Sequence, residues 1–278
     1  MNAENKTAII MVGGGMKSPH GGGFLYAMAT ELGIPSPDIM IASSGDAGSI
    51  LYFCTGEYES MRRVWTEWVS TPQFISVWRF WRIMDVDYLV DTVFKQQEPL
   101  NIKKLAATTI QWQIPITDVD SGETRYIGAK NNVDPFETLR ATKAIPILFG
   151  KKIAIGKHRY IDGEFGPTLD DHVRHAFALG AQRIVIVNHL APWTLRRRVV
   201  ACAYALLRSR ATRRALLRDI FTSITHFDGK GAEVLFVNPQ RLPTGTATRD
   251  QEKVRATFAR GYQDALALKD ELRTLFNV

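Results

Sequence analysis

Residues 7–15 (TAIIMVGGG) give the first information about the fold of this chain. The run at 7–12 is short and almost entirely apolar, which is typical of a strand buried on both faces of a parallel sheet. Three glycines follow it directly, and glycine allows the tight turn that ends such a strand. The stretch therefore predicts a buried first strand with a glycine loop at its carboxyl end.

The same alternation of short apolar strands and helices continues along the chain. Further strands are predicted at 39–42, 158–161, 183–188 and 233–237, with a hairpin over 111–128. Helices are predicted over 24–32, 47–54, 57–69, 134–146, 169–179 and 250–276. This order predicts an α/β fold with a mostly parallel central sheet sandwiched by helices.

Composition narrows the class of protein. The chain has 278 residues, of which 45% are hydrophobic and 10% aromatic, enough for a large core in one α/β domain or two smaller ones. Two cysteines are too few for a disulfide scaffold or a four-cysteine zinc site. No apolar run is long enough to span a bilayer, and residues 1–6 do not resemble a signal peptide. We therefore expect a cytoplasmic protein, with membrane association left open.

The net charge of +7 is concentrated in one segment. Residues 194–218 contain eight arginines and no acidic residue, and the rest of the chain has 27 basic and 28 acidic residues. No nucleic-acid-binding motif surrounds the segment, so no nucleic-acid partner is expected. Its arginines do not gather on one helical face, so an exposed insertion and docking to an anionic membrane surface both stay open.

The glycine loop is the first candidate site. Backbone N–H groups of Gly13, Gly14 and Gly15 can point at an anion, either a phosphate or a reaction oxyanion. The spacing matches neither the dinucleotide fingerprint nor the P-loop. A simple strand-to-helix turn is the alternative.

Two further candidates follow predicted strands. Ser44 lies between Ala42 and Gly45 at a strand-to-helix turn, as a nucleophile does at an elbow, although a helix N-cap is the alternative. Asp162, followed by Gly163, ends a strand, where it would be a general base or an ordinary turn residue.

In this order, the segments resemble the patatin-like phospholipases. Residues 13–17 are similar to that family's G-G-G-x-[KR]-G loop, residues 42–46 to its G-x-S-x-G elbow, and residues 162–163 to its D-G-[GA] motif. A fourth stretch at 139–146 (LRATKAIP), followed by Phe149, resembles the segment that precedes the family's aspartate. The resemblance covers about residues 7–190.

The resemblance implies a serine acyl-ester hydrolase that acts on phospholipids or related lipid esters without metal or cofactor. Ser44 would be the nucleophile and Asp162 the base of a Ser–Asp dyad. Gly13, Gly14 and Gly15 would form the oxyanion hole, and Lys17, Gly45 and Gly163 would support the site. The family organisation implies one domain over 1–278, with a small helical cap at 57–105 and a basic helical insertion at 191–230.

Four residues depart from the family pattern. Ala42 and Asp46 replace the two elbow glycines, Ser18 replaces the glycine after Lys17, and Glu164 replaces a small residue after Gly163. Asp46 and Glu164 would place negative charge near a developing oxyanion. A catalytically impaired relative that binds lipid or protein is therefore the alternative.

The histidines and the aromatic residues near the candidate site are expected to have different roles. None of the six histidines is expected to be catalytic, although His20 and His189 fall beside the glycine loop and at a strand end. Trp68, Phe74, Trp78 and Trp81 are predicted to line an acyl-chain groove or to touch a lipid surface, with core packing as the alternative.

Overall fold

The computed structural model describes most of the chain. The described residues are 5–80, 82–146, 148–189, 232–239 and 241–278, with Val199, Cys202, Leu206, Arg213 and Leu217 as isolated residues. The predicted basic insertion at 191–230 lies outside them apart from those five residues, and Trp81 also lies outside. The two interpretations of the basic segment therefore stay predictions.

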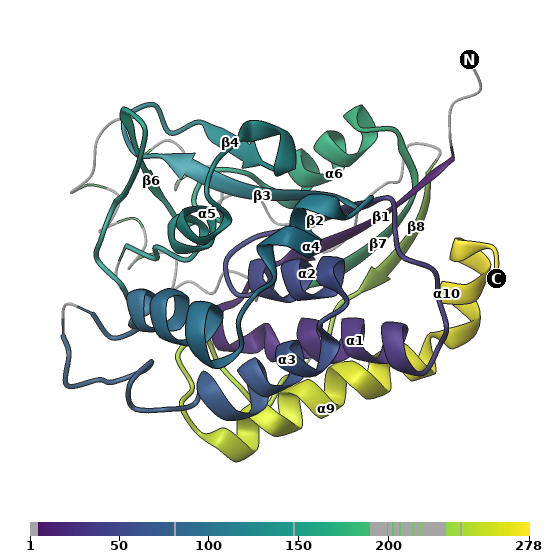
Figure 1. Cartoon of the computed structure of the whole chain (residues 1–278), viewed down its shortest axis with the longest axis horizontal. Helices are drawn as coiled ribbons and strands as arrows, with labels where there is room; N and C mark the ends of the chain where they lie inside the picture. The colour runs from purple at the N-terminus through teal and green to yellow at the C-terminus, as the bar shows by residue number, and fades with distance from the viewer. Residues whose placement is uncertain are drawn as a thin grey trace.

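An eight-stranded sheet forms the centre of the molecule (Figure 1). Its order is β5-β6-β3-β2-β1-β7-β8, with β4 paired to β3. The parallel strands are β1 (Lys6–Val12), β2 (Ile39–Ala42), β3 (Gln111–Asp118), β7 (Ala181–Asn188) and β8 (Glu233–Val237). An antiparallel extension consists of β4 (Thr124–Ile127), β5 (Ile153–Ile155) and β6 (His158–Ile161).

Helices cover both faces of this sheet. The longer ones are α1 (Pro19–Thr30), α2 (Asp46–Thr55), α5 (Pro135–Thr142), α6 (Leu169–Ala178), α9 (Gln251–Ala267) and α10 (Lys269–Phe276). In β1, Ile9 and Met11 belong to the core under α1 and α2, whereas Ala8 and Ile10 pack with Val173 of α6. Figure 1 shows α6 and α1 on opposite sides of the strands. The predicted α/β sandwich is confirmed.

The predicted cap segment is mostly helical. It contains α3 (Tyr58–Arg63), the π-helical segments η2 (Val64–Trp68) and η3 (Tyr88–Gln97), and the start of α4 (Ile102–Ala107). Short 3-10 turns, η1 (Gly15–Lys17) and η4 (Ala129–Asn131), complete the described helical elements. The predicted function of the segment as a cap, and the single-domain boundaries, remain predictions.

The helix predicted over 134–146 ends earlier, at Thr142, and two other predicted helix boundaries are also wrong. The first helix begins at Pro19 rather than at 24, so that Gly22 and Gly23 lie inside it. These glycines do not mark a loop: they are needed because Trp65 and the backbone of Phe258 leave no room for a Cβ. The last helix is two helices separated at Leu268, so that Leu272 and its neighbours in α10 can pack into the main core. Both differences follow from contacts distant in sequence.

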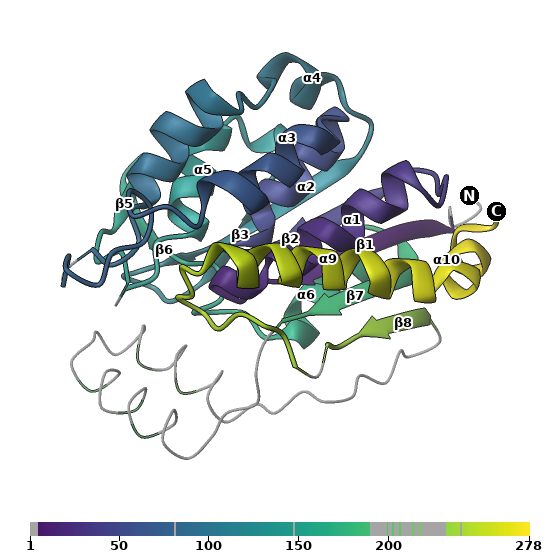
Figure 2. The ribbon, with the colours of Figure 1, turned by 90° about the horizontal axis from the view of Figure 1, so that it is seen from below.

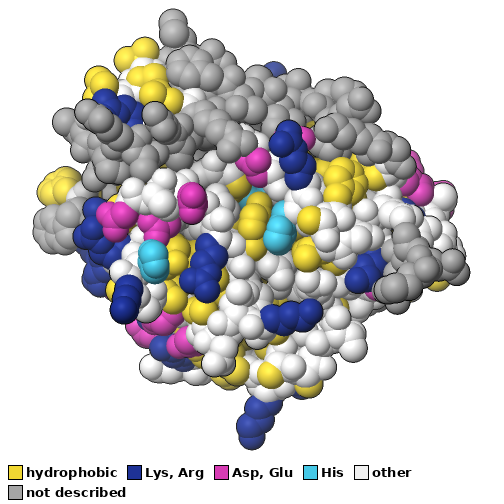
Figure 3. Space-filling model, turned by 90° about the horizontal axis from the view of Figure 1, so that it is seen from above, with side chains coloured by type: hydrophobic (Ala, Val, Ile, Leu, Met, Phe, Trp, Pro, Cys, Tyr) yellow, Lys and Arg dark blue, Asp and Glu magenta, His cyan; other side chains and the backbone are white. Residues whose placement is uncertain are grey.

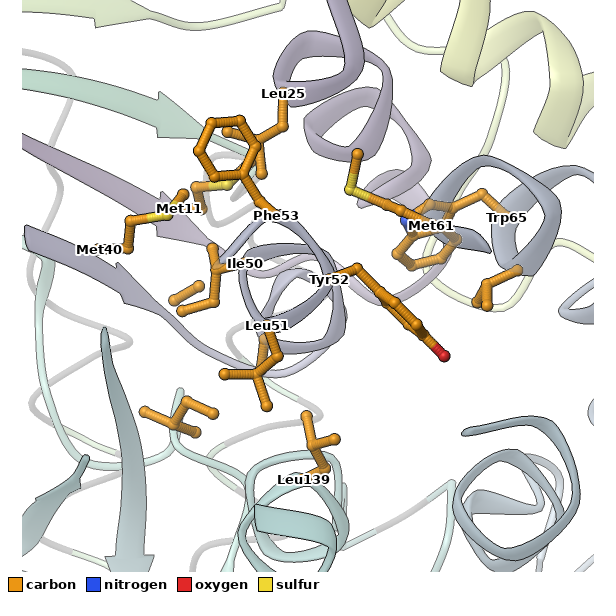
Figure 4. Packing of buried hydrophobic residues seen from close by; sticks show 14 of the residues in the cluster. Met11, Leu25, Met40, Ile50, Leu51, Tyr52, Phe53, Met61, Trp65 and Leu139 are labelled. Carbon is orange, nitrogen blue, oxygen red and sulfur yellow. The ribbon is translucent and has the colours of Figure 1, made fainter. Parts of the chain in front are cut away.

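The helix α2 is buried along its whole length. All ten of its residues are buried, and Figure 4 shows Ile50, Leu51, Tyr52 and Phe53 directed to different sides of it. A helix that is buried all round is typical of a protein interior. The start of α2 is therefore held from every side, which fixes the turn that precedes it.

Within the described residues, no helix combines the length and the apolarity that crossing a membrane would require.

Candidate active site

Ser44 lies in a strained turn between β2 and α2. Its φ of 47° is in the left-handed region, which residues other than glycine rarely occupy. The other described non-glycine residues with positive φ are Asn132 and Asn277, and asparagine tolerates this region better than serine. Since α2 begins after Gly45 without a side-chain cap, the N-cap alternative is wrong. The backbone has the geometry of an elbow.

Two neighbours hold the backbone of Ser44. Its N–H donates to Thr142 Oγ1 at 3.1 Å, and Lys143 Nζ donates to its carbonyl oxygen. Both neighbours lie in the stretch 139–146, which resembles the segment that precedes the aspartate in the patatin-like family. The turn is therefore braced by side chains, although the serine itself is only 4% exposed.

Asp162 follows β6, and its carboxyl lies close enough to the Ser44 side chain for that side chain to affect its pKa. One carboxylate oxygen accepts a hydrogen bond from the Glu164 N–H at 2.9 Å, and the other is buried without a hydrogen-bond partner among the described residues. Burial raises the pKa of Asp162 to about 7, and the Glu164 amide, the Ser44 side chain and the Lys143 ammonium counteract that rise. A carboxyl with this pKa can take up and release a proton near neutral pH.

The glycine loop runs directly against the elbow. A Cβ on Gly13 would lie 2.7 Å from Ser44 Cβ, so only glycine permits this approach. Gly15 has a φ of 60°, and a Cβ there would meet the Thr246 carbonyl oxygen at 2.5 Å. The loop and Ser44 are therefore brought together as the motifs predict.

The loop N–H groups have weak partners. Gly13 N–H donates to Ser43 Oγ and to Glu164 Oε1, both at 3.3 Å, and Gly14 N–H donates to Ser18 Oγ at 3.4 Å. Hydrogen bonds of this length are long and weak. Glu164 therefore reaches the loop, as its departure from the family pattern suggested.

Asp46 has a different environment from the one expected. It is completely buried, and its Oδ2 accepts from Ser18 Oγ at 2.9 Å and contacts His189 Nδ1 at 3.0 Å. Its carboxylate lies against Gly21 of α1, which has no Cβ to interfere. Gly21 thus makes room for the extra bulk, and Ser18 and His189 satisfy Oδ2, whereas Oδ1 is buried without a hydrogen-bond partner among the described residues.

His20 and His189, which the sequence places near the site, form a row of hydrogen-bonded side chains with Asp46 and Asp264. This row is here called the buried chain. His189 Nε2 lies 3.1 Å from His20 Nδ1, and His20 Nε2 lies 2.9 Å from Asp264 Oδ2 in α9. Burial, and to a lesser degree the nearby His189, lower the pKa of His20 to about 4, although Asp264 and Asp46 act in the opposite direction.

The remaining predicted supporting residues pack around the loop and the aspartate. Lys17 Nζ donates to the His189 carbonyl oxygen at 3.0 Å, which ties the loop to the end of β7. A Cβ on Gly45 would overlap Ser18 Oγ, and one on Gly163 would overlap the Pro115 carbonyl oxygen. All three residues therefore lie where the loop, elbow and aspartate turn pack together.

Lys143 is a site residue that the sequence did not identify. It is the one buried lysine among the described residues, and its Nζ also donates to the Gly45 carbonyl oxygen at 3.1 Å. Burial lowers its pKa to about 8, while the charges of Asp46 and Asp162 act in the opposite direction. The sequence did contain a signal for this residue, because Lys143 is a charged residue within the motif at 139–146, directly after the short helix α5.

An apolar cavity adjoins Ser44. Its polar end contains Ser44 and Lys143, and its walls include Trp65, Phe74 and Phe94. The cavity is narrow, with a volume of about 40 Å³. Its apolar lining suits an apolar group better than a polar one.

The predicted aromatic groove is correct only in part. Phe74 lines the cavity, whereas Trp68 donates its indole N–H to Glu98 at 3.4 Å and Trp78 is 79% exposed. The groove prediction is therefore wrong for Trp68 and Trp78. Trp65, which comes from η2, takes the place of Trp68 because the helical turn directs it inward.

Within the described part of the chain, no group of three or more histidine, cysteine or acidic side chains has an arrangement that could hold a metal ion.

Comparison with known proteins gives a structural relative only. No family model matches the sequence, and no curated protein matches it. The fold is similar to that of VipD from Legionella pneumophila, with a TM-score of 0.55 and 11% sequence identity. The match covers 96% of this chain and 67% of that chain. The α/β fold is thus shared over nearly the whole chain.

Proposed function

We propose that the protein is a serine acyl-ester hydrolase that acts on phospholipids or related lipid esters through Ser44 and Asp162. The observation that carries this proposal is the strained backbone of Ser44 with the buried Asp162 carboxyl beside it. Strain of this kind is concentrated at functional sites, and a buried carboxyl with a pKa of about 7 is a suitable general base. The fold shared with VipD supports the architecture, not the chemistry.

The proposed reaction has two stages. Asp162 accepts the Ser44 hydroxyl proton while Oγ bonds to the ester carbonyl carbon, and the carbonyl electron pair moves to oxygen. Gly14 and Gly15 N–H groups stabilise that oxyanion. The intermediate then expels the alcohol, which takes the proton from Asp162. Water then loses a proton to Asp162 while its oxygen bonds to the acyl carbon. This second intermediate expels Ser44 Oγ, which takes the proton back from Asp162, and the carboxylic acid leaves.

The surroundings of the dyad support a lipid substrate. The cavity beside Ser44 has apolar walls, and burying an acyl chain there would remove apolar surface from water. The Lys143 ammonium stabilises the charged form of Asp162, which is the form that accepts a proton. The site therefore combines a base, an apolar channel and a compensating cation.

A second candidate function is a lipid-binding module without catalysis. The contact between Glu164 Oε1 and Gly13 N–H favours it, because a carboxylate next to the loop would oppose an oxyanion. Asp46 supports this alternative less directly, since its Oδ2 is engaged by Ser18 and His189, although its Oδ1 is buried without a hydrogen-bond partner among the described residues.

Labelling with a fluorophosphonate and hydrolysis of a short-chain nitrophenyl ester separate the two candidates. We expect the wild-type chain to be labelled and active, and Ser44→Ala to lose labelling and at least about a thousandfold of the rate. Asp162→Asn should lose about a hundredfold or more, as expected for a general base. The neighbouring Ser43→Ala is the matched control and should still be labelled. A folded wild-type chain that neither reacts nor hydrolyses would favour the binding module.

A further inference from the structure

A small apolar surface projects from the wall of the cavity. Val77, Trp78 and Phe80, here called the apolar tip, are 64%, 79% and 75% exposed. They are three of the six exposed large hydrophobic side chains among the described residues, and they fall within four positions. Single exposed apolar residues are ordinary, whereas a cluster of this kind marks an interaction surface.

The polar groups around the apolar tip turn back toward the body. Arg79 donates to the carbonyl oxygens of Gln73 and Phe74 at 3.0 Å and to Asp85 at 3.3 Å. Arg82 donates to Asp87 at 2.6 Å. Since both guanidinium groups are paired with carboxylates, the segment presents its apolar side chains without a free positive charge of its own.

The chain that carries the apolar tip also forms part of the cavity. Ile75 pairs with Met84 in an antiparallel bridge, and Ser76 N–H donates to the Ile83 carbonyl oxygen at 2.8 Å. Phe74 and Met84, at the base of this loop, line the cavity that contains Ser44. Figures 1 and 2 both show the loop projecting at the left side of the molecule.

The face shown in Figure 3 carries many charged side chains, in contrast to the apolar tip. Basic and acidic side chains are intermixed across the described residues of that face, so no charge of one sign dominates it. A lipid surface that met this face would therefore encounter no uniform field of one sign.

We propose that the apolar tip inserts into the interfacial layer of a zwitterionic lipid surface and places the cavity against it. Tryptophan and phenylalanine are suited to this layer, where an aromatic ring can sit beside lipid headgroups. An acyl chain could then pass along Phe74 and Met84 to Ser44 with little exposure to water. This inference rests on the proposed function for its substrate, and its binding step can be measured without catalysis.

Flotation of the full chain with phosphatidylcholine vesicles tests the binding step. The Ser44→Ala chain should float with the vesicles, and adding Trp78→Ser and Phe80→Ser should lower the bound fraction about tenfold. Binding should persist when salt rises from about 0.1 M to about 0.5 M, because screening affects charges and not apolar insertion. Val278→Ser, which changes an exposed side chain at the chain terminus, is the matched control and should bind like the parent.

Hydrolysis assays separate this inference from the proposed function. In the active chain, the two tip substitutions should lower the rate on vesicles about tenfold and leave kcat/KM for a soluble short-chain ester unchanged. A wild-type chain that hydrolyses no ester would overturn the proposed function. The flotation measurement would still test whether the apolar tip binds vesicles. Equal flotation of the tip variant and its parent would overturn the inference, and so would binding that requires anionic lipid or disappears at high salt.

Discussion

Asp162 and Lys143 are buried groups of opposite charge that stabilise each other at the candidate site. Burial alone would favour the neutral form of each. The pKa of Asp162 is about 7 and that of Lys143 about 8, and each group counteracts the effect of burial on the other. A single lysine, within hydrogen-bond reach of the Ser44 backbone, therefore affects both the conformation of the elbow and the protonation of the base.

The pH dependence of ester hydrolysis tests this relation. Asp162 accepts a proton only when ionised, so kcat/KM should fall as pH drops below about 7. In Lys143→Met the compensating charge is lost, the pKa of Asp162 rises, and the fall should begin about one pH unit higher. Lys143→Arg keeps the charge and should retain a profile closer to that of the wild type. An acid limb at the same pH in wild type and Lys143→Met would contradict this role.

At the scale of elements, the buried chain connects the start of α2, the end of β7, α1 and α9. Asp46, His189, His20 and Asp264 come from these four places and meet through three hydrogen bonds. Removing one partner from a buried charged network leaves the others without compensation. This row of four hydrogen-bonded side chains therefore couples α2, the helix that follows Ser44, to helix α9 in the C-terminal part of the fold.

Replacement of Asp46 measures this coupling. Asp46→Asn keeps the shape but removes the charge that pairs with His189, so the free energy of unfolding should fall by about 2–4 kcal/mol in urea titrations. The exposed pair of Asp120 and Arg159 offers a control, and Asp120→Asn should change stability by less than about 1 kcal/mol. A loss no larger than that of the control would show that the buried chain contributes little.

At the scale of the whole molecule, α9 brings the end of the chain onto α1. Gly261 lies so close to the backbone of His20 that a Cβ would overlap its carbonyl oxygen. This approach also places Asp264 within reach of His20. The C-terminal helix is thus part of the core that supports the site.

Gly261→Ala should disturb this packing. The added methyl group forces α1 and α9 apart, and overpacking of this kind should lower the free energy of unfolding by about 1–3 kcal/mol. Thermal unfolding followed by circular dichroism is a suitable measurement. The exposed neighbour Ala259→Ser should change stability by less than about 0.5 kcal/mol. Equal melting temperatures for the two variants would contradict the close packing of α1 and α9.

The sequence by itself determined most strands and helices and the order of the candidate motifs. Apolar periodicity and turn residues are local properties, so β1, β2, α2 and the position of Ser44 at a turn followed from them. The predicted fold class is confirmed, whereas the assignment of Ser44, Asp162 and the glycine loop to catalysis stays a proposal.

Only the tertiary structure decided which distant residues meet. The early start of α1 involves contacts with Trp65 and Phe258, and the break at Leu268 lets α10 pack into the main core, which no local pattern contains. The pairing of His20 with His189 and the contact of Lys143 with the elbow arise in the same way. Such contacts depend on how the elements pack, because burial and partner choice are properties of the assembled fold rather than of any one segment.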